Sequence, residues 1–317
     1  MQKFWGCMAM IIATVIWGFA FSAQSSGMRF VGPVLFVALR SIIGVFALIM
    51  VCMVFDYCRD KRLSIRGNAK TKEEQKFLLH GGLYCGLAIS AASICQQWGL
   101  KYISAGKTGF LTALYIVIVP LIGIFFKRKT TPMLWLAVFL ALSGSYLLCG
   151  SIDKIGAGEL LVIACAMLYS IHILVIDHYA PHCDCIRLSC IQFMVASVLC
   201  SGASLLAGEQ WILQDIVRAT PFWVFCGVGS SAIAFTLQMV CQKYVHPVAA
   251  SLLMSLESVF AVLGGWLFLQ EKLSVMEFTG CCVIMIAILL SQIPFPLKRK
   301  PDAPLTIQDP PSPHNDR

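Results

Sequence analysis

Charged residues are scarce in this sequence. Of its 317 residues only 13% are Asp, Glu, Lys or Arg, whereas 58% are hydrophobic, and the mean hydropathy is +0.80. A water-soluble domain of this length carries about 25% charged residues, most of them on its surface. The scarcity therefore excludes a soluble globular protein and predicts an all-α integral membrane protein.

Motifs that carry hydrolytic or metal chemistry are also missing. The chain contains no His-Glu-x-x-His, no Gly-x-Ser-x-Gly and no paired-Asp motif. A membrane enzyme would need a metal-binding or nucleophilic set of this kind. We therefore expect neither an enzyme nor a cofactor.

The fifteen cysteines lack the regular spacing of a disulfide framework, and most of them lie inside apolar runs. Such cysteines are typical small packing residues. One cluster, His182-Cys183-Asp184-Cys185 with His178 four residues earlier, leaves a metal site open as an interpretation. We favour a polar loop that happens to contain cysteines, and expect no metal.

Long apolar runs fill most of the chain. Each is about 20 residues long, the length that an α-helix needs to cross a bilayer core roughly 30 Å thick. The first run has no small-residue cleavage site at its end, because Phe21 stands there, so we interpret it as a helix rather than a signal peptide. We predict ten transmembrane helices, at residues 5–27, 34–56, 77–99, 103–126, 131–151, 156–177, 187–207, 220–241, 247–270 and 273–294.

The net charge of +8 comes mainly from short segments between these runs. With the N-terminus in the cytoplasm, inside segments hold sixteen Lys and Arg and outside segments five. The positive-inside rule then places both termini in the cytoplasm, and the charge gives no reason to expect nucleic acid. The Pro-rich segment 295–317 predicts a disordered cytoplasmic tail. The two sets are Lys3, Arg59, Lys61, Arg62, Arg66, Lys70, Lys72, Lys76, Lys127, Arg128, Lys129, Arg187, Lys243, Lys298, Arg299 and Lys300 inside, and Arg29, Lys101, Lys154, Arg218 and Lys272 outside.

The chain repeats itself. The spacing from Trp17 to Arg40 equals that from Tyr169 to Gln192, at a shift of 152 residues. Later, Gln96-x4-Lys101-Tyr102 matches Gln238-x4-Lys243-Tyr244 at a shift of 142, although Cys85-Gly86 matches Cys226-Gly227 better at 141. We therefore predict two related halves, residues 5–151 and 156–294.

Five helices in each half is an odd number, so the second half must enter the membrane in the opposite sense. Inverted repeats of this kind are how many secondary transporters build alternating access, with the solute site where the repeats meet. Enzymes and receptors need no such symmetry. The repeat therefore indicates a transporter.

Glu257 is the leading candidate site residue, because it lies near the middle of the ninth predicted helix. An ionisable group at that depth is costly and is a functional candidate by default. A structural carboxylate bonded to a neighbouring helix is the alternative. The shift of 142 carries Tyr115 onto Glu257, and Tyr115 shares a polar helix face with Thr112.

Two basic residues also lie within predicted helices. Arg40 lies about two turns into the second helix, where it either binds an anionic group of a solute or pairs internally. Lys107 lies one turn inside the fourth helix, where it either reaches the interface or lines a cavity.

Aromatic and amide side chains complete the candidate set. Trp17 and its repeat mate Tyr169 share helix faces with Gln24 and His172, respectively, and could form an aromatic, polar-edged lining. Four glutamines within the predicted helices, Gln96, Gln97, Gln192 and Gln238, either join helices by hydrogen bonds or face a cavity.

Several stretches resemble an EamA-type domain of the drug/metabolite transporter superfamily, over residues 5–292. They are Trp17-Gly18-Phe19-Ala20-Phe21 with Pro33 and Arg40, then 106–115 with Pro120, and Leu256-Glu257-Ser258-Val259-Phe260 through 271–273. Ser258 stands where that domain usually has Pro, which predicts a less bent helix, and Gln270 stands where it usually has Gly.

This resemblance implies ten helices in two inverted EamA repeats around a central cavity. Members export amino acids, metabolites or drugs, or exchange sugar nucleotides and phosphorylated sugars, often with proton coupling. We expect an exporter of small solutes in the inner (plasma) membrane, as a monomer or homodimer. A phosphorylated-sugar or sugar-nucleotide exchanger would need several cavity cations, and a non-transporting scaffold or flippase subunit would need no deep acid.

Overall fold

The computed structural model describes residues 1–60, 71–125, 132–149, 156–268, 270 and 274–292. Every regular element in these ranges is a helix. The expected tail at 295–317 lies outside the described residues, as do the basic stretches 61–70 and 126–131.

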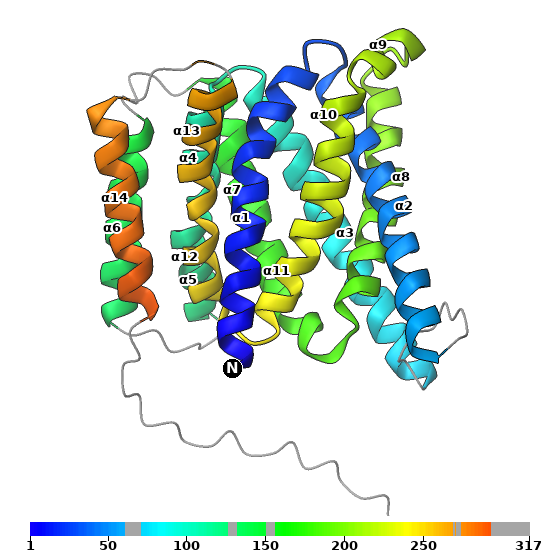
Figure 1. Cartoon of the computed structure of the whole chain (residues 1–317), viewed down its shortest axis with the longest axis horizontal. Helices are drawn as coiled ribbons and strands as arrows, with labels where there is room; N and C mark the ends of the chain where they lie inside the picture. Colours follow the sequence, from blue (N-terminus) through cyan, green and yellow to red (C-terminus); the bar gives the residue numbers. More distant parts are fainter. Residues whose placement is uncertain (61–70, 126–131, 150–155, 269, 271–273, 293–317) are drawn as a thin grey trace, which may run out of the picture.

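The helices follow one another with short connections, and Figure 1 shows them standing side by side. The first half contains α1 (Gln2–Gly27), α2 (Pro33–Asp60), α3 (Lys72–Leu100), α4 (Ala105–Thr112), α5 (Tyr115–Phe125) and α6 (Pro132–Cys149). The second contains α7 (Ala157–Tyr179), η1 (Ala180–His182), α8 (Cys185–Leu206), α9 (Leu213–Arg218), α10 (Thr220–Val224), η2 (Phe225–Ala234), α11 (Phe235–Gln242), α12 (Pro247–Met254), α13 (Leu256–Phe268) and α14 (Val275–Gln292).

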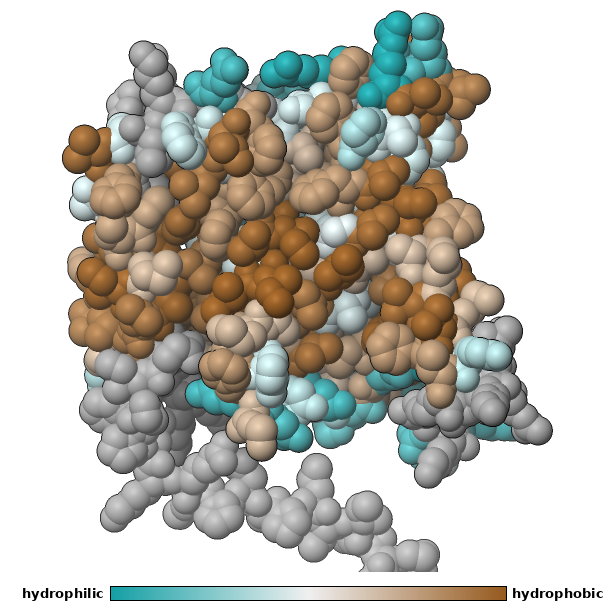
Figure 2. Space-filling model, viewed as in Figure 1, coloured by the Kyte–Doolittle hydropathy of each residue, from teal (hydrophilic) through white to brown (hydrophobic). Residues whose placement is uncertain are grey.

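The helices are long and apolar enough for a membrane protein. By length and composition, eight helical segments of the described chain could cross a bilayer, and α6 and α14 hold shorter apolar stretches, Trp135–Leu147 and Phe278–Leu290. Figure 2 shows a broad hydrophobic belt between hydrophilic residues at the two ends. The chain is therefore a multi-span membrane protein, while the count of ten spans stays a prediction.

The two halves pack against each other in a reciprocal way. The first helix of the first half, α1, contacts η2, α11 and α13 of the second, and the first helix of the second half, α7, contacts α3, α4 and α5 of the first. In addition, α2 packs against α8 and α6 against α14. These contacts are those expected of two related repeats.

Two predicted helices are interrupted. The predicted helix 103–126 is divided into α4 and α5 at residues 113–114, and the predicted helix 247–270 into α12 and α13 at Ser255. Pro120 lies inside α5 and weakens the turn before it, since proline lacks an N–H and crowds the carbonyl of residue 116. Ser255 bonds back to the Leu252 carbonyl at 2.6 Å, which competes with the helical hydrogen bonds.

These interruptions occupy equivalent places, because a shift of 142 carries Ala113 onto Ser255. The structure interrupts this helix at Ser255, three residues before Ser258, and the less bent helix that Ser258 predicts stays a prediction. The predicted helix 220–241 also differs from expectation: its middle part, η2, is a ten-residue π-helix. The short α9 was not predicted.

Candidate functional site

A small buried cavity lies where the two halves meet. Its volume is about 30 Å³, room for about two water molecules. Side chains from α1, α2, α3, α4 and α5 of the first half and from α7, η2, α11, α12 and α13 of the second enclose it. The lining residues are Trp17, Phe21, Gln24, Arg40, Gln96, Thr112, Tyr115, Tyr169, Ser230, Phe235, Met254 and Glu257.

Tyr115 and Glu257 form the central polar contact of this cavity. The Tyr115 hydroxyl donates a hydrogen bond of 2.8 Å to Glu257 Oε1, and both side chains are buried. Each residue lies in the first turn after a helix interruption, Tyr115 in α5 and Glu257 in α13.

Arg40 is the one cationic side chain among the lining residues that the structure describes. It is only 3% exposed, and its guanidinium makes no hydrogen bond or ion pair with any described residue. A buried guanidinium without an acceptor is unfavourable. Of the two interpretations left open by the sequence, internal pairing finds no partner in the described chain, and binding of an anionic group stays a prediction.

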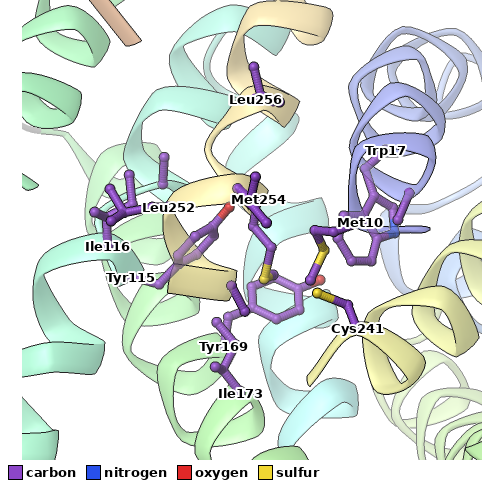
Figure 3. Packing of buried hydrophobic residues seen from close by; sticks show 14 of the residues in the cluster. Met10, Trp17, Tyr115, Ile116, Tyr169, Ile173, Cys241, Leu252, Met254 and Leu256 are labelled. Carbon is purple, nitrogen blue, oxygen red and sulfur yellow. The ribbon is translucent and has the colours of Figure 1, made fainter. Parts of the chain in front are cut away.

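Aromatic rings and amides form the remaining wall. The Trp17 ring packs on Phe235 with centroids 4.8 Å apart, and its indole Nε1 is buried without a partner in the described chain, as is Gln24 Oε1. Gln96 donates to Thr112 Oγ1 at 3.2 Å. In Figure 3, Trp17, Tyr115, Tyr169 and Met254 surround the same region.

Three predicted site residues do not line the cavity. Lys107 forms an ion pair of 2.5 Å with Glu159 in the first turn of α7. His172 lies one turn beyond Tyr169 and contacts Gln192. Gln238 lies one turn beyond Phe235 and bonds to Gln242.

Four lining residues were not among the predicted site residues. Met254 carried a usable signal, because it shares the helix face of Glu257. Phe21, Ser230 and Phe235 carried none, since aromatic and serine residues are common in packed membrane helices.

The cysteine-rich segment contains no metal-binding group of three or more His, Cys, Asp or Glu among the residues that the structure describes. Asp184 instead caps α8, accepting from the Ile186 and Arg187 amides. Its other oxygen accepts from Arg187 at 2.7 Å. The segment therefore has a structural explanation.

Comparison with known proteins agrees with this two-repeat layout. A model described as the EamA-like transporter family matches residues 4–150 and again 156–292. Among curated proteins, the chain is 24% identical to the uncharacterized transporter YoaV of Bacillus subtilis, over 91% of this chain and 97% of that one. It is 26% identical to an uncharacterized transporter of Archaeoglobus fulgidus, over 66% and 67%. A crystal structure shares the fold, with TM-score 0.70 at 17% identity over 90% of this chain and 96% of that one.

Proposed function

Because the chain belongs to the EamA-like transporter family of the drug/metabolite transporter superfamily, we propose that it is a secondary transporter exporting small amino-acid-like or drug-like solutes. It acts in the plasma membrane with ten spans and both termini in the cytoplasm. Protons serve as the coupling ion, and no cofactor takes part.

The observation that carries this proposal is the opposite charge of two buried cavity residues that do not pair with each other. Arg40 offers a planar, bidentate donor suited to a carboxylate. Glu257 offers a carboxylate for an ammonium group or a proton. Trp17 and Phe235 offer apolar faces for the rest of the molecule. A small zwitterionic or amphipathic solute fits this distribution.

Alternating access follows from the same architecture. The cavity is small, and both interrupted helices place their second segments at its wall. Interrupted helices near the middle of the bilayer are typical of transporters whose inverted repeats rock about a central site. We propose that α4/α5 and α12/α13 change their angles at residues 113–114 and at Ser255.

A phosphorylated substrate is less well supported. Such a solute carries about two negative charges and needs several cationic donors. Among the described lining residues only Arg40 is cationic, and Lys107 is paired with Glu159. A non-transporting scaffold or flippase subunit would have no use for an unpaired guanidinium in a buried cavity.

The test is transport by purified protein in proteoliposomes with an imposed pH gradient. A thermal-shift screen against amino acids, sugars, nucleotides and cationic drugs selects the labelled solutes. We expect the wild type to move at least one zwitterionic or amphipathic solute faster with the gradient, and the Glu257→Gln variant to lose this acceleration. The Asp215→Asn variant removes a half-buried carboxylate outside the cavity and should behave like wild type. Unchanged gradient-driven transport in Glu257→Gln would refute the coupling role.

A further inference from the structure

A second polar cluster lies one helical turn beyond the cavity, toward the face that carries the N-terminus. It comprises His172 on α7, Ser189 and Gln192 on α8, and Gln238 on α11, and we call it the polar layer. All four side chains are fully buried. His172 Nε2 lies 2.7 Å from Gln192 Oε1. On α11, Gln238 donates to Gln242, which in turn donates to the carbonyl of Ile173, next to His172.

Several polar atoms of the polar layer have no hydrogen-bond partner within the described chain. Within the described chain, His172 Nδ1, Ser189 Oγ, Gln192 Nε2 and Gln238 Oε1 all lack a hydrogen-bond partner. Polar side chains that only join membrane helices are expected to be paired, since an unpaired polar atom is costly in a low-dielectric interior. Four unpaired atoms on three adjoining helices therefore indicate a place that water or a polar group enters.

Phe235 lies between the polar layer and the cavity. It lines the cavity, and its ring contacts Trp17 on the cavity side, with centroids 4.8 Å apart, and His172 in the layer, at 5.8 Å. Phe193 packs on the same ring at 5.5 Å but does not line the cavity. Phe235 thus lies between the cavity and the polar layer, beside Tyr169, whose ring centroid is 6.3 Å from that of His172, and Met254, whose sulfur accepts from Gln238 at 3.8 Å.

Beyond the polar layer, α8 and α11 reach a pocket of about 460 Å³ near the face with the N-terminus. It is lined by the start of α3, the turn between α7 and α8, and the end of α11, including Asp184, Arg187 and Lys243. The polar layer therefore occupies the interval between the central cavity and this pocket.

The repeat supports the same assignment independently. The shift of 152 carries Arg40 onto Gln192, and Trp17 onto Tyr169. Arg40 and Gln192 are thus equivalent residues of the two halves, and Gln192 Nε2 is buried without a hydrogen-bond partner in the described chain. In an inverted repeat, equivalent residues flank the central site from opposite membrane faces.

We propose that the polar layer is a second compartment of the solute pathway, entered by the polar head group of a neutral or zwitterionic solute together with water, and that Phe235 is its gate toward the cavity. This proposal rests on the proposed transport function. The layer offers donors and acceptors, whereas the fixed charges Arg40 and Glu257 belong to the cavity. A fully anionic head group would find no cation in the layer.

Hydroxyl-radical footprinting in proteoliposomes without added solute tests this, because it labels side chains that touch water. Rates are normalised to those of the denatured chain. We expect His172 to be labelled several times faster than Ile173 and Ile176, which are equally buried but apolar. Phe235→Ala should raise the His172 rate further, whereas Phe193→Ala, an equal truncation beside the same ring, should not. Gln192→Leu should lower it.

A His172 rate equal to that of Ile173 in the wild type would overturn the proposal. Equal effects of Phe235→Ala and Phe193→Ala on the His172 labelling rate would overturn the assignment of Phe235 as the gate. The labelling needs no transported solute, so a failure to detect transport in proteoliposomes would contradict the proposed function and leave this result standing.

Discussion

At the scale of single residues, the backbone of Gln270 is unusual. Its backbone φ is 58°, in the left-handed region that residues other than glycine rarely adopt. The EamA-type ending that this stretch resembles has glycine here, and the structure gives the physical reason. The substitution by glutamine leaves a strained residue after α13.

Replacing Gln270 by glycine should therefore raise the free energy of unfolding by about 1 kcal/mol, because glycine removes the cost of the left-handed conformation. Thermal unfolding of the purified protein in detergent measures the change. Gly208 also has a positive φ, of 70°, with open space around it, so Gly208→Ala should shift the stability in the opposite direction. No rise for Gln270→Gly would contradict the argument.

Much of the candidate site could be placed from sequence. Glu257, Tyr115, Trp17, Arg40, Tyr169, Gln96 and Thr112 all line the cavity, although their roles in transport stay predictions. The cost of burying polar groups in a membrane made these residues visible. The same argument also selected His172, Gln238 and Lys107, which do not line the cavity. Helical periodicity predicts the face of a helix on which a residue lies, but not its height relative to neighbouring helices.

At the scale of elements, the π-helix η2 explains an irregularity of the repeat. The halves align at a shift of 141 at Cys85 and of 142 at Gln96, so the second half has one extra residue between Cys226 and Gln238. A π-helix absorbs one extra residue while keeping both flanking segments in orientation. Its position, Phe225–Ala234, overlaps this interval in all but its first residue. The sequence showed the one-residue change in the repeat shift, but only the structure showed the π-helix that accounts for it.

Deleting Gly229 from η2 should therefore be tolerated, because an ordinary α-helix would replace the π-helix without turning Phe235 or Gln238 away. Deleting Ala91 from the equivalent, regular part of α3 should not, since it rotates the rest of that helix by about 100°. Size-exclusion profiles and thermal unfolding of the two deletion variants provide the comparison. Equal losses of folded protein would show that η2 is not an inserted residue.

The pairing of α1 with α13 depends on a close approach at Gly18. A Cβ atom there would lie 2.2 Å from Phe260 Cβ and 2.6 Å from its carbonyl carbon. Gly18→Val should lower the free energy of unfolding by about 3 kcal/mol or more, because backbone atoms cannot yield as flexible side chains do. Gly202→Val, on α8 with nothing within 4 Å, is the matched control and should cost under about 1 kcal/mol in the same melting assay.

At the scale of the whole molecule, charged contacts hold some helix pairs more firmly than others. Glu209 accepts hydrogen bonds from the Val34 and Leu35 amides at one end of α2, and Arg187 of α8 pairs with Asp56 at the other. The pair α2 and α8 is thus joined near both ends. In the alternating access proposed above, we expect this pair to move as one unit relative to α4/α5, α7, α12 and α13.

The ion pair between Lys107 and Glu159 joins α4 of the first half to α7 of the second at the face opposite the N-terminus. The repeat shifts carry these two residues onto Ala249 and Cys7, which cannot form an ion pair. The two membrane faces therefore differ in charge, although the fold relates them by symmetry. The ion pair adds to the apolar packing of Phe110 and Leu111 on Val162 and favours the conformation in which α4 and α7 are joined at that face.

Removing both charges, with Lys107→Met and Glu159→Gln together, should favour opening at that face without leaving a buried charge unpaired. A partly buried charged hydrogen bond contributes about 1.5–3 kcal/mol, and about 1.4 kcal/mol corresponds to a tenfold change in population. Amide hydrogen exchange at the first turns of α4 and α7 should accelerate about tenfold or more, with no change at the start of α12. The pair Arg218–Asp215, 3.7 Å apart, offers a control in Arg218→Met with Asp215→Asn. If both double variants show the same amide exchange rates, the ion pair between Lys107 and Glu159 does not stabilise this face. The difference between the two faces would then come from the aromatic packing at Phe235.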